Sequence, residues 1–239
     1  MQSAKIERLL PYILILLGVL LLLTIWLTYR VQPAASIAPQ GSNNARIVVI
    51  DAGHGGMDGG ATSVSGMLES GINLEIAKKT DAVIRFLGYA TVMTRGSDKS
   101  LHDITAATIA DKKRSDLKNR VKLVNSVPNA VLISVHQNFF EQEQYFGAQI
   151  FWNDDASSQS FAVAAQENFR RLDARNTREA KRSSGVYLMS NADCPAILVE
   201  CGFLSNAGDE RNLTRPDYQI KVAAVIAASL SNWELNEVG

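Results

Sequence analysis

Two histidines and two glutamates occupy positions from which a metal-dependent hydrolase could be built. His54 lies in IDAGHGGMDGG, His136 in LISVHQN and Glu200 in AILVECGFLSN, while Glu69 stands in a predicted loop before a helical pattern. Imidazole nitrogen and carboxylate oxygen bind Zn²⁺, and catalytic zinc sites use three protein ligands with one position left for water. The four residues therefore predict a His/Glu/His ligand set, with Glu200 as a further carboxylate that can transfer protons.

The spacing of these residues leaves other interpretations open. The ligands lie far apart along the chain, unlike the pair in a local His-Glu-x-x-His motif. A histidine at the end of a strand is often a hydrogen-bonded structural residue. The glycines around His54 could form a phosphate loop, but no Gly-Lys-Ser/Thr follows them and they do not match Gly-x-Gly-x-x-Gly. We interpret them as a tight turn that lets the backbone approach a ligand closely.

Alternating strand and helix patterns must position these residues. Segments rich in β-branched residues predict strands at Ile47–Asp51, Ala90–Thr94, Val131–His136, Ala148–Trp152, Val186–Met189 and Ala196–Glu200. Apolar residues at helical spacing predict helices at Ile72–Leu87, Ser115–Asn125, Phe161–Leu172 and Tyr218–Leu230.

This alternation predicts a single α/β domain with a largely parallel sheet flanked by helices. In such sheets, ligand sites form beyond the carboxyl ends of the strands. His54, His136 and Glu200 each fall at the predicted carboxyl end of a strand. We therefore expect them to meet in one crevice.

The N-terminal segment has the properties of a membrane anchor. It carries no charge from Tyr12 to Tyr29, and Lys5 and Arg8 precede it. A helix of this length rises roughly 27 Å, which is close to the hydrocarbon thickness of a bilayer. The preceding positive charges predict a cytoplasmic N-terminus. A cleaved signal peptide is the alternative, and both interpretations place the rest of the chain outside the cytoplasm.

Composition and segment boundaries complete this organisation. The chain has 24 basic and 24 acidic side chains, which gives no support to a nucleic-acid partner, since such binding needs a clustered cationic face. We expect a cytoplasmic tip and single transmembrane helix in residues 1–30, a linker in residues 31–45 and the catalytic domain in residues 46–239.

Read in order, the motifs resemble a known family. DAGHGGMDGGA, Glu69, the segment Leu117-x-x-Arg120-x4-Asn125, SVHQN and VECGFLSN are similar to the zinc-dependent N-acetylmuramoyl-L-alanine amidases of the amidase-3 family. The resemblance covers nearly the whole predicted catalytic domain, in the order of the family. It implies a twisted, mostly parallel sheet with helices on both faces.

The resemblance also implies the roles of individual residues. His54, Glu69 and His136 match the zinc ligands of the family, and Glu200 matches its catalytic glutamate. The implied reaction cleaves the amide bond between N-acetylmuramic acid and L-alanine of the stem peptide in peptidoglycan. The architecture is most similar to the spore-cortex branch, whose enzymes remove stem peptides before muramic δ-lactam forms. This branch implies a site of action at the cell membrane or in the forespore intermembrane space.

Residues beside the predicted ligands could extend the site. Asp51 could orient His54 or satisfy nearby backbone N–H groups, and Asn138 could contact the metal ligands or the substrate. The family often has alanine after the His-x-Asn sequence, whereas FFEQEQYF runs here from Phe139 to Phe146. This aromatic segment could bind a protein partner or a glycan strand, or cap the core.

A cluster of basic residues begins at the end of the third predicted helix and continues beyond it, and it is either a solvated surface or a contact for wall-peptide carboxylates or anionic lipids. It comprises Arg170, Arg171, Arg175, Arg178, Lys181 and Arg182.

Two other function classes also remain open at this point. One is another zinc hydrolase of peptidoglycan, such as a peptidase that cuts between two amino acids. The other is a membrane-anchored, non-enzymatic regulator that binds the wall.

Overall fold

The computed structural model describes residues 46–237. The predicted anchor in residues 1–30 and the predicted linker in residues 31–45 lie outside the described residues. Between residues 46 and 237, no helix combines the length and the apolar character that crossing a bilayer requires.

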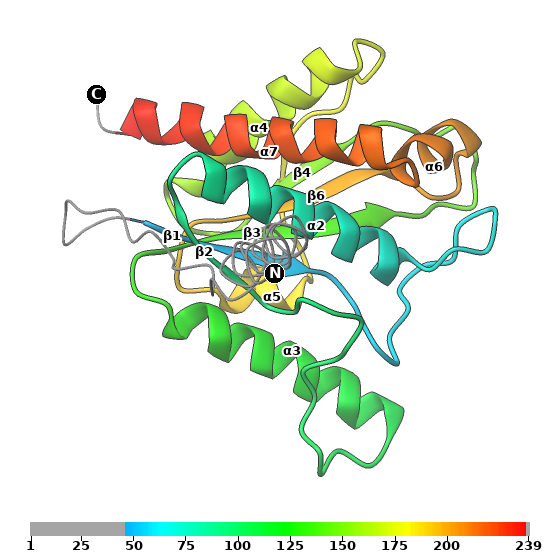
Figure 1. Cartoon of the computed structure of the whole chain (residues 1–239), viewed down its shortest axis with the longest axis vertical. Helices are drawn as coiled ribbons and strands as arrows, with labels where there is room; N and C mark the ends of the chain where they lie inside the picture. The colour runs from blue at the N-terminus through cyan, green and yellow to red at the C-terminus, as the bar shows by residue number, and fades with distance from the viewer. Residues whose placement is uncertain (1–45, 238–239) are drawn as a thin grey trace, which may run out of the picture. The chain divides into compact units, whose positions relative to one another are not determined.

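A six-stranded sheet forms the centre of the domain, in the order β2-β1-β3-β6-β4-β5 (Figure 1). The strands are β1 Ile47–Ala52, β2 Ala90–Met93, β3 Ala130–Asn138, β4 Gln149–Trp152, β5 Lys181–Arg182 and β6 Ala196–Phe203. Strands β2, β1, β3 and β6 are parallel to one another. Strand β4 runs antiparallel to β6, and β5 is parallel to β4. The sheet is therefore mixed, with a parallel central part.

Helices cover both faces of this sheet (Figure 1). They are α2 Glu69–Phe86, α3 Ile109–Ser126, α4 Ser158–Leu172, α5 Tyr187–Asn191, α6 Ala207–Leu213 and α7 Pro216–Glu237. Helix α7 packs against both α2 and α4 on one face, while α3 packs against α5 on the other. Helix α6 follows β6 near the carboxyl ends of the parallel strands.

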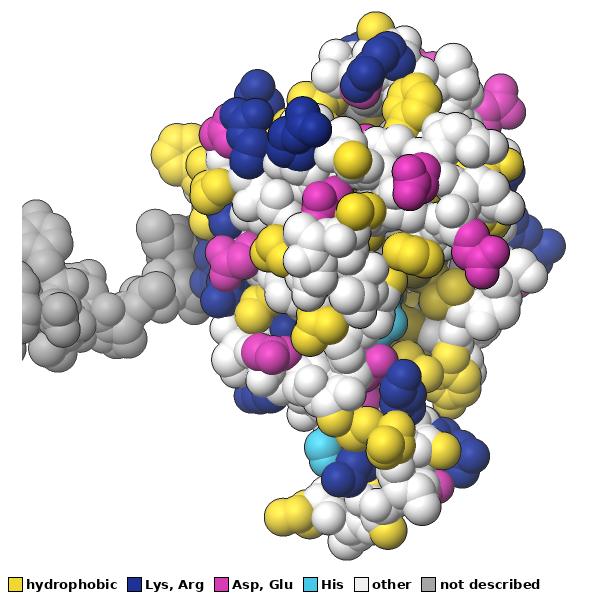
Figure 2. All heavy atoms as spheres, turned by 90° about the vertical axis from the view of Figure 1, so that its right-hand side faces the viewer, with side chains coloured by type: hydrophobic (Ala, Val, Ile, Leu, Met, Phe, Trp, Pro, Cys, Tyr) yellow, Lys and Arg dark blue, Asp and Glu magenta, His cyan; other side chains and the backbone are white. Residues whose placement is uncertain are grey.

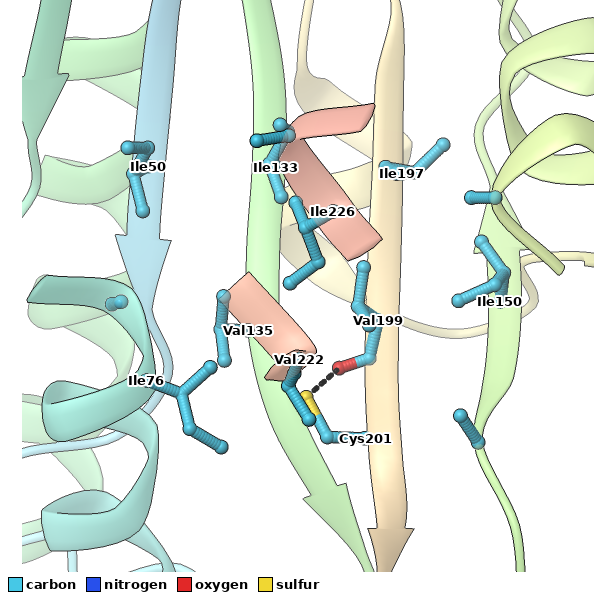
Figure 3. Close-up of a cluster of buried hydrophobic side chains, with 14 of the residues drawn as sticks. Ile50, Ile76, Ile133, Val135, Ile150, Ile197, Val199, Cys201, Val222 and Ile226 are labelled. Atoms are coloured by element: carbon cyan, nitrogen blue, oxygen red, sulfur yellow. Dashed lines mark hydrogen bonds between the residues drawn. The ribbon is translucent and has the colours of Figure 1, made fainter. Parts of the chain in front are cut away.

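Alternating side chains of the strands divide the core into two layers, because successive residues of a strand point to opposite faces. Figure 3 shows Ile133, Val135 and Val199 facing Val222 and Ile226 of α7, and all five are buried. The second layer contains buried apolar residues from α3, α5 and the opposite strand faces. The core therefore fixes which strand positions face α2 and α7 and which face α3.

The predicted strands are confirmed with one exception. The segment Val186–Met189 is not a strand, because Val186 is the extended residue before helix α5. Leu188 and Met189 enter the second core layer from that helix, so apolar residues suited to a buried strand instead cover a sheet face.

The predicted helices are also present, although their boundaries differ. Helix α3 begins at Ile109, before the predicted start at Ser115, and its N-cap residue Thr108 accepts a hydrogen bond from the backbone of Asp111. Helix α2 begins at Glu69, which the sequence had placed in a preceding loop. The side chain of Glu69 is therefore fixed by a helix rather than by a loop.

Candidate metal centre and active site

The turn after β1 brings two backbone segments unusually close to side chains of other elements. His54 has a φ of 60°, in the left-handed region. A Cβ atom on Gly53 would lie 2.2 Å from the ring of His136, and one on Gly60 would lie 2.5 Å from Oε2 of Glu69. These two positions require glycine, because any side chain would occupy the space taken by the imidazole or the carboxylate.

The structure brings together the three residues predicted as metal ligands. Potential ligand atoms of His54, Glu69 and His136 all lie within 4.8 Å of one another. Oε2 of Glu69 is 3.3 Å from Nε2 of His54, and Oε1 is 3.1 Å from Nδ1 of His136. His102, in contrast, lies outside this cluster and approaches Ser100 Oγ at 2.8 Å.

Neighbouring groups hold the carboxylate of Glu69 in place. The backbone N–H of Ala61 donates to its Oε2 at 3.0 Å, and the backbone N–H of Gln137 donates to its Oε1 at 3.2 Å. The side-chain amide of Asn73 also donates to Oε1, at 3.0 Å. Glu69 is thus a buried acceptor with a fixed orientation, as a metal ligand requires.

Charge interactions within the cluster shift the pKa values of its members. Burial opposes protonation of His54, but hydrogen bonds and charge from Glu69 and Asp58 raise its pKa to about 9. Burial likewise opposes ionisation of Glu69, yet His136 and His54 hold the pKa of this carboxyl well below its usual range. The cluster therefore strongly favours the ionised form of Glu69, which is the form that binds a metal.

Asp58 orients His54, a role that the sequence had offered to Asp51. Oδ2 of Asp58 lies 2.9 Å from Nδ1 of His54, while Lys113 of α3 lies 2.9 Å from Oδ1 of the same carboxylate. The only available sequence signal was an aspartate four positions after a histidine in a glycine-rich turn. Because Asp58 faces Nδ1, the Nε2 atom of His54 is directed toward Glu69.

Asp51 instead belongs to a buried network beneath the turn. Its carboxylate accepts hydrogen bonds from Thr94 and Ser134, at 2.8 and 2.7 Å, and from Arg120 at 2.5 Å. Arg120 also donates to the backbone carbonyl of His54 at 2.6 Å. The expectation that Asp51 contacts the imidazole of His54 or backbone N–H groups is thus corrected: its influence on His54 passes through Arg120.

Glu200 lies beside the cluster with an unusual environment. It is the direct Cα partner of His136 across strands β6 and β3. Its Oε2 atom is buried without a hydrogen-bond partner among the described residues. Burial raises the pKa of Glu200 to about 7. A buried, unpartnered carboxylate oxygen is costly, and such groups are concentrated at functional sites.

The aromatic segment Phe139–Phe146 combines exposed and packed side chains. Phe139 and Phe140 are 46% and 52% exposed, which fits neither a pure core nor a fully free surface. Phe140 packs edge-on against Tyr145, with ring centres 5.4 Å apart. The side chain of Asn138 accepts a hydrogen bond from the backbone of Phe139 at 2.8 Å, so it supports the start of this segment.

The cluster fits a divalent cation by the chemistry of its donors. Two imidazoles and one carboxylate converge at the carboxyl end of the parallel strands, and zinc accepts this donor set. Figure 2 looks onto this side of the molecule and shows a recessed histidine side chain among apolar, acidic and basic groups. Glu200 is paired with His136 across the sheet, and its Oε2 atom has no hydrogen-bond partner among the described residues. It is therefore placed to act as the proton acceptor that a metal site would require.

Comparison with known proteins identifies the family. Residues 48–232 match the family model described as N-acetylmuramoyl-L-alanine amidase, Amidase_3. This chain belongs to that amidase family. Members hydrolyse the amide bond between N-acetylmuramic acid and L-alanine, so the comparison favours the amidase over the peptidase and over the non-enzymatic regulator.

One relative of the amidase is named for a role in germination. It is 38% identical over 184 residues to the germination-specific N-acetylmuramoyl-L-alanine amidase of Bacillus subtilis, covering 77% of each chain. The CwlD amidase from Clostridioides difficile, solved in complex with the GerS lipoprotein, has a TM-score of 0.76 and 35% identity over 78% of this amidase and 97% of that chain. The amidase AmiC2 of Nostoc punctiforme has a TM-score of 0.70 and 26% identity, covering 82% and 99% of the two chains.

Proposed function

We propose that this amidase depends on zinc held by His54, Glu69 and His136, with Glu200 as the proton-transfer residue. The observation that carries the proposal is the convergence of three ligand atoms within 4.8 Å, beside the unpartnered oxygen of Glu200. Bound zinc supplies Lewis-acid polarisation of the scissile carbonyl and activates water at neutral pH.

The chain's own residues then divide the remaining work. Glu200 accepts the proton of the attacking water and delivers it to the amine of the departing L-alanine. Asp58 holds the imidazole of His54 in the orientation that exposes Nε2. Asn138 lies two residues beyond His136 at the end of β3, past a shift in the register of β3 against β6, and we propose that its side-chain amide contacts the substrate.

A metal assay combined with muropeptide mass spectrometry tests this proposal. We expect about one zinc per chain, loss of turnover on chelation and its return when zinc is added. The products should be an intact stem peptide with a free L-alanine N-terminus and a glycan with a free lactyl carboxylate. A product cut between two amino acids would contradict the proposed bond specificity.

Histidine variants supply a matched comparison for the metal site. His136→Ala should lose both zinc and activity, because it removes one of three ligands. His102→Ala is the control, since His102 lies outside the cluster and contacts Ser100; it should keep both. Full zinc binding by His136→Ala would remove the proposed ligand set.

We further propose a role in the spore cortex, supported by the similarity to the germination-specific amidase of Bacillus subtilis. The amidase would strip stem peptides from the glycan and so create the muramic acid from which δ-lactam is formed. Deletion of the gene should therefore abolish muramic δ-lactam in the cortex. The intact gene should restore it and a Glu200→Gln allele should not. Normal δ-lactam in the deletion strain would exclude this role.

The predicted membrane attachment completes the proposed setting. The apolar segment Tyr12–Tyr29 would hold the domain at the cell membrane or in the forespore intermembrane space. If the domain faces the cell exterior, protease added to sealed protoplasts should digest it and leave a short membrane-bound fragment; if it lies in the forespore intermembrane space, digestion should require opening of the mother-cell membrane. Recovery of the full chain in the soluble fraction would contradict an uncleaved anchor.

The exposed part of the aromatic segment is our candidate surface for a protein partner. The solved complex of the Clostridioides difficile relative with a lipoprotein supports a partner of this kind, as do the exposed rings of Phe139 and Phe140. Replacing both with serine should weaken complex formation by co-purification. Unchanged activity and unchanged binding in the double variant would refute the assignment.

A further inference from the structure

A cationic pocket lies one strand away from Glu200. It has a volume of about 470 Å³ and is lined by the aromatic segment, by β4 and by the loop that leads to β5. Three cations, Arg175, Arg178 and Lys181, line it together with a single acid, Glu179. Its net charge is positive, and its position beside the reaction centre distinguishes it from the groove lined by Lys99 and Lys122.

The register of the sheet joins this pocket to the reaction centre. His136 is the Cα partner of Glu200, and Glu200 is the Cα partner of Gln149. Directly opposed residues point to the same face of a sheet, with Cβ atoms about 5 Å apart. His136, Glu200 and Gln149 therefore form a continuous row across β3, β6 and β4. Gln149 lines the pocket at the far end of that row.

Arg178 is held at this end of the row by neutral groups. Its guanidinium donates to the side-chain oxygen of Gln149 at 3.1 Å and to the backbone carbonyl of Phe146 at 2.9 Å. It also stacks over the ring of Phe203 at 4.4 Å and lies 5.8 Å from the ring of Tyr145. These contacts fix its position without neutralising its charge.

The charge of the pocket is only partly compensated. Arg175 forms an ion pair with Asp173 at 2.7 Å, whereas Arg178 and Lys181 form none with any residue between 46 and 237. Burial lowers the pKa of Arg178, although the nearby charges of Asp209 and Tyr145 oppose that shift. An orientated guanidinium with spare donors is suited to a carboxylate, which it can bind through two hydrogen bonds.

We propose that this pocket binds a carboxylate of the peptidoglycan stem peptide, with Arg178 as its main contact and Lys181 as a secondary one. The inference rests on the proposed amidase function, because the stem peptide begins at the bond that is cut. Peptide residues beyond L-alanine would then follow the row from Glu200 toward Gln149. A membrane surface fits less well, because Arg178 lies recessed between aromatic rings rather than on a protruding face.

Kinetics with matched substrates test the proposal. The full-length, zinc-loaded chain would be given a disaccharide-pentapeptide with free carboxylates and its counterpart with amidated carboxylates. We expect KM to be about tenfold lower for the free form, as one charge-assisted hydrogen bond provides. Arg178→Gln should raise KM about tenfold for the free form only and leave kcat within about twofold.

Two further variants separate recognition from structural support. Arg178 also holds the backbone of Phe146, so its replacement could act through the structure of the pocket. Lys181 has an exposed side chain without this role, and Lys181→Gln should raise KM about threefold for the free form alone. Arg171→Gln is the matched control, because Arg171 lies on α4 outside the pocket; its KM should equal that of the wild type. Equal KM values for both substrates in the wild type, or equal losses on both in the variants, would overturn the proposal.

Two other outcomes are distinguishable from these. If Arg178→Gln and Lys181→Gln lose binding to phosphatidylglycerol vesicles while KM is unchanged, the pocket faces a membrane and the proposal is wrong. Failure of the amidase function itself would appear as a wild type that releases no stem peptide. In that case calorimetric binding of the two intact muropeptides to Glu200→Gln still measures the carboxylate preference directly, and equal affinities would overturn it.

Discussion

Asp51 on β1 and Glu200 on β6 are carboxylates on the same face of one sheet, in very different surroundings. Asp51 accepts hydrogen bonds from Thr94, Ser134 and Arg120, and although burial opposes its ionisation, Arg120 and the other partners lower its pKa to about 2. Glu200 has a buried oxygen without a hydrogen-bond partner between residues 46 and 237, and burial raises its pKa to about 7.

This difference separates a carboxylate that supports the site from one that acts in it. A fully hydrogen-bonded ion pair fixes its neighbours, because moving any member exposes a buried charge. Arg120 extends that rigidity to the backbone carbonyl of His54. An unpartnered carboxylate remains available to a proton and to a substrate, at a cost to stability.

The largest expected effect concerns Glu200. Replacing it with glutamine should lower kcat by about 10³-fold, because proton transfer is lost, while zinc content stays unchanged and thermal stability does not fall. Muropeptide turnover, metal analysis and thermal unfolding measure the three quantities. Glu167→Gln, at an exposed position on α4, is the control. Retained turnover in Glu200→Gln would show that Glu200, like Asp51, takes no direct part in the reaction.

Asp51 should show the opposite response. Asp51→Asn leaves Arg120 buried with one carboxylate partner fewer, and we expect the free energy of unfolding to fall by about 3 kcal/mol at pH 7. Denaturant unfolding measures this change. Asp217→Asn breaks an exposed pair with Arg215 and should have no measurable effect. An equally small effect for Asp51→Asn would mean that the buried network does not support the turn.

Acid should remove the contribution of Asp51 over a defined interval. Its folded pKa of about 2 lies below the ordinary value of 3.8. The contribution is therefore fully present above pH 4 and is lost as the pH falls from about 4 through 2. About 2 kcal/mol of stability should disappear over that range. The stability difference between wild type and Asp51→Asn should shrink in the same interval, and a difference that stays constant with pH would contradict the assignment.

The smallest expected effect concerns Asp58, which supports a ligand without forming a buried network. Asp58→Ala should weaken zinc binding about tenfold, because His54 loses the group that orients Nδ1, and Asp58→Asn should retain part of the affinity. Competition with a chelating dye measures both. Lys113 contacts Asp58 but not His54, so Lys113→Gln should change the affinity for zinc less than threefold. If all three variants bound zinc as tightly as the wild type, groups other than Asp58 would orient His54.

Much of the fold follows from the sequence, and the departures have identifiable causes. Alternating strand and helix patterns predicted the α/β class because burial of one face imposes a period on each element. The direction of β4 could not be read in this way, since an apolar strand has the same pattern whether it runs parallel or antiparallel to β6. Residues 187–191 form a helix although their apolar side chains suited a strand, because short buried segments satisfy either period.

The residues of the candidate site also fall into those that the sequence predicted and those that it missed or misplaced. His54, His136 and Glu200 could be proposed from the sequence because each follows or ends a strand. Asp58 was missed because an aspartate in a glycine-rich turn has many local hydrogen-bonding uses. Asp51 was given a role at His54 because it is near in sequence, whereas its partners Ser134 and Arg120 come from β3 and α3.

The sequence by itself determined the class of fold, the set of donors and the family resemblance, because periodicity and residue chemistry are properties of local segments. Only the tertiary structure decided which carboxylate is paired, which oxygen is left without a partner and which arginine faces the end of the row at Gln149. Those outcomes depend on contacts between residues far apart along the chain. The packing of strands and helices, rather than any local pattern, sets those distances.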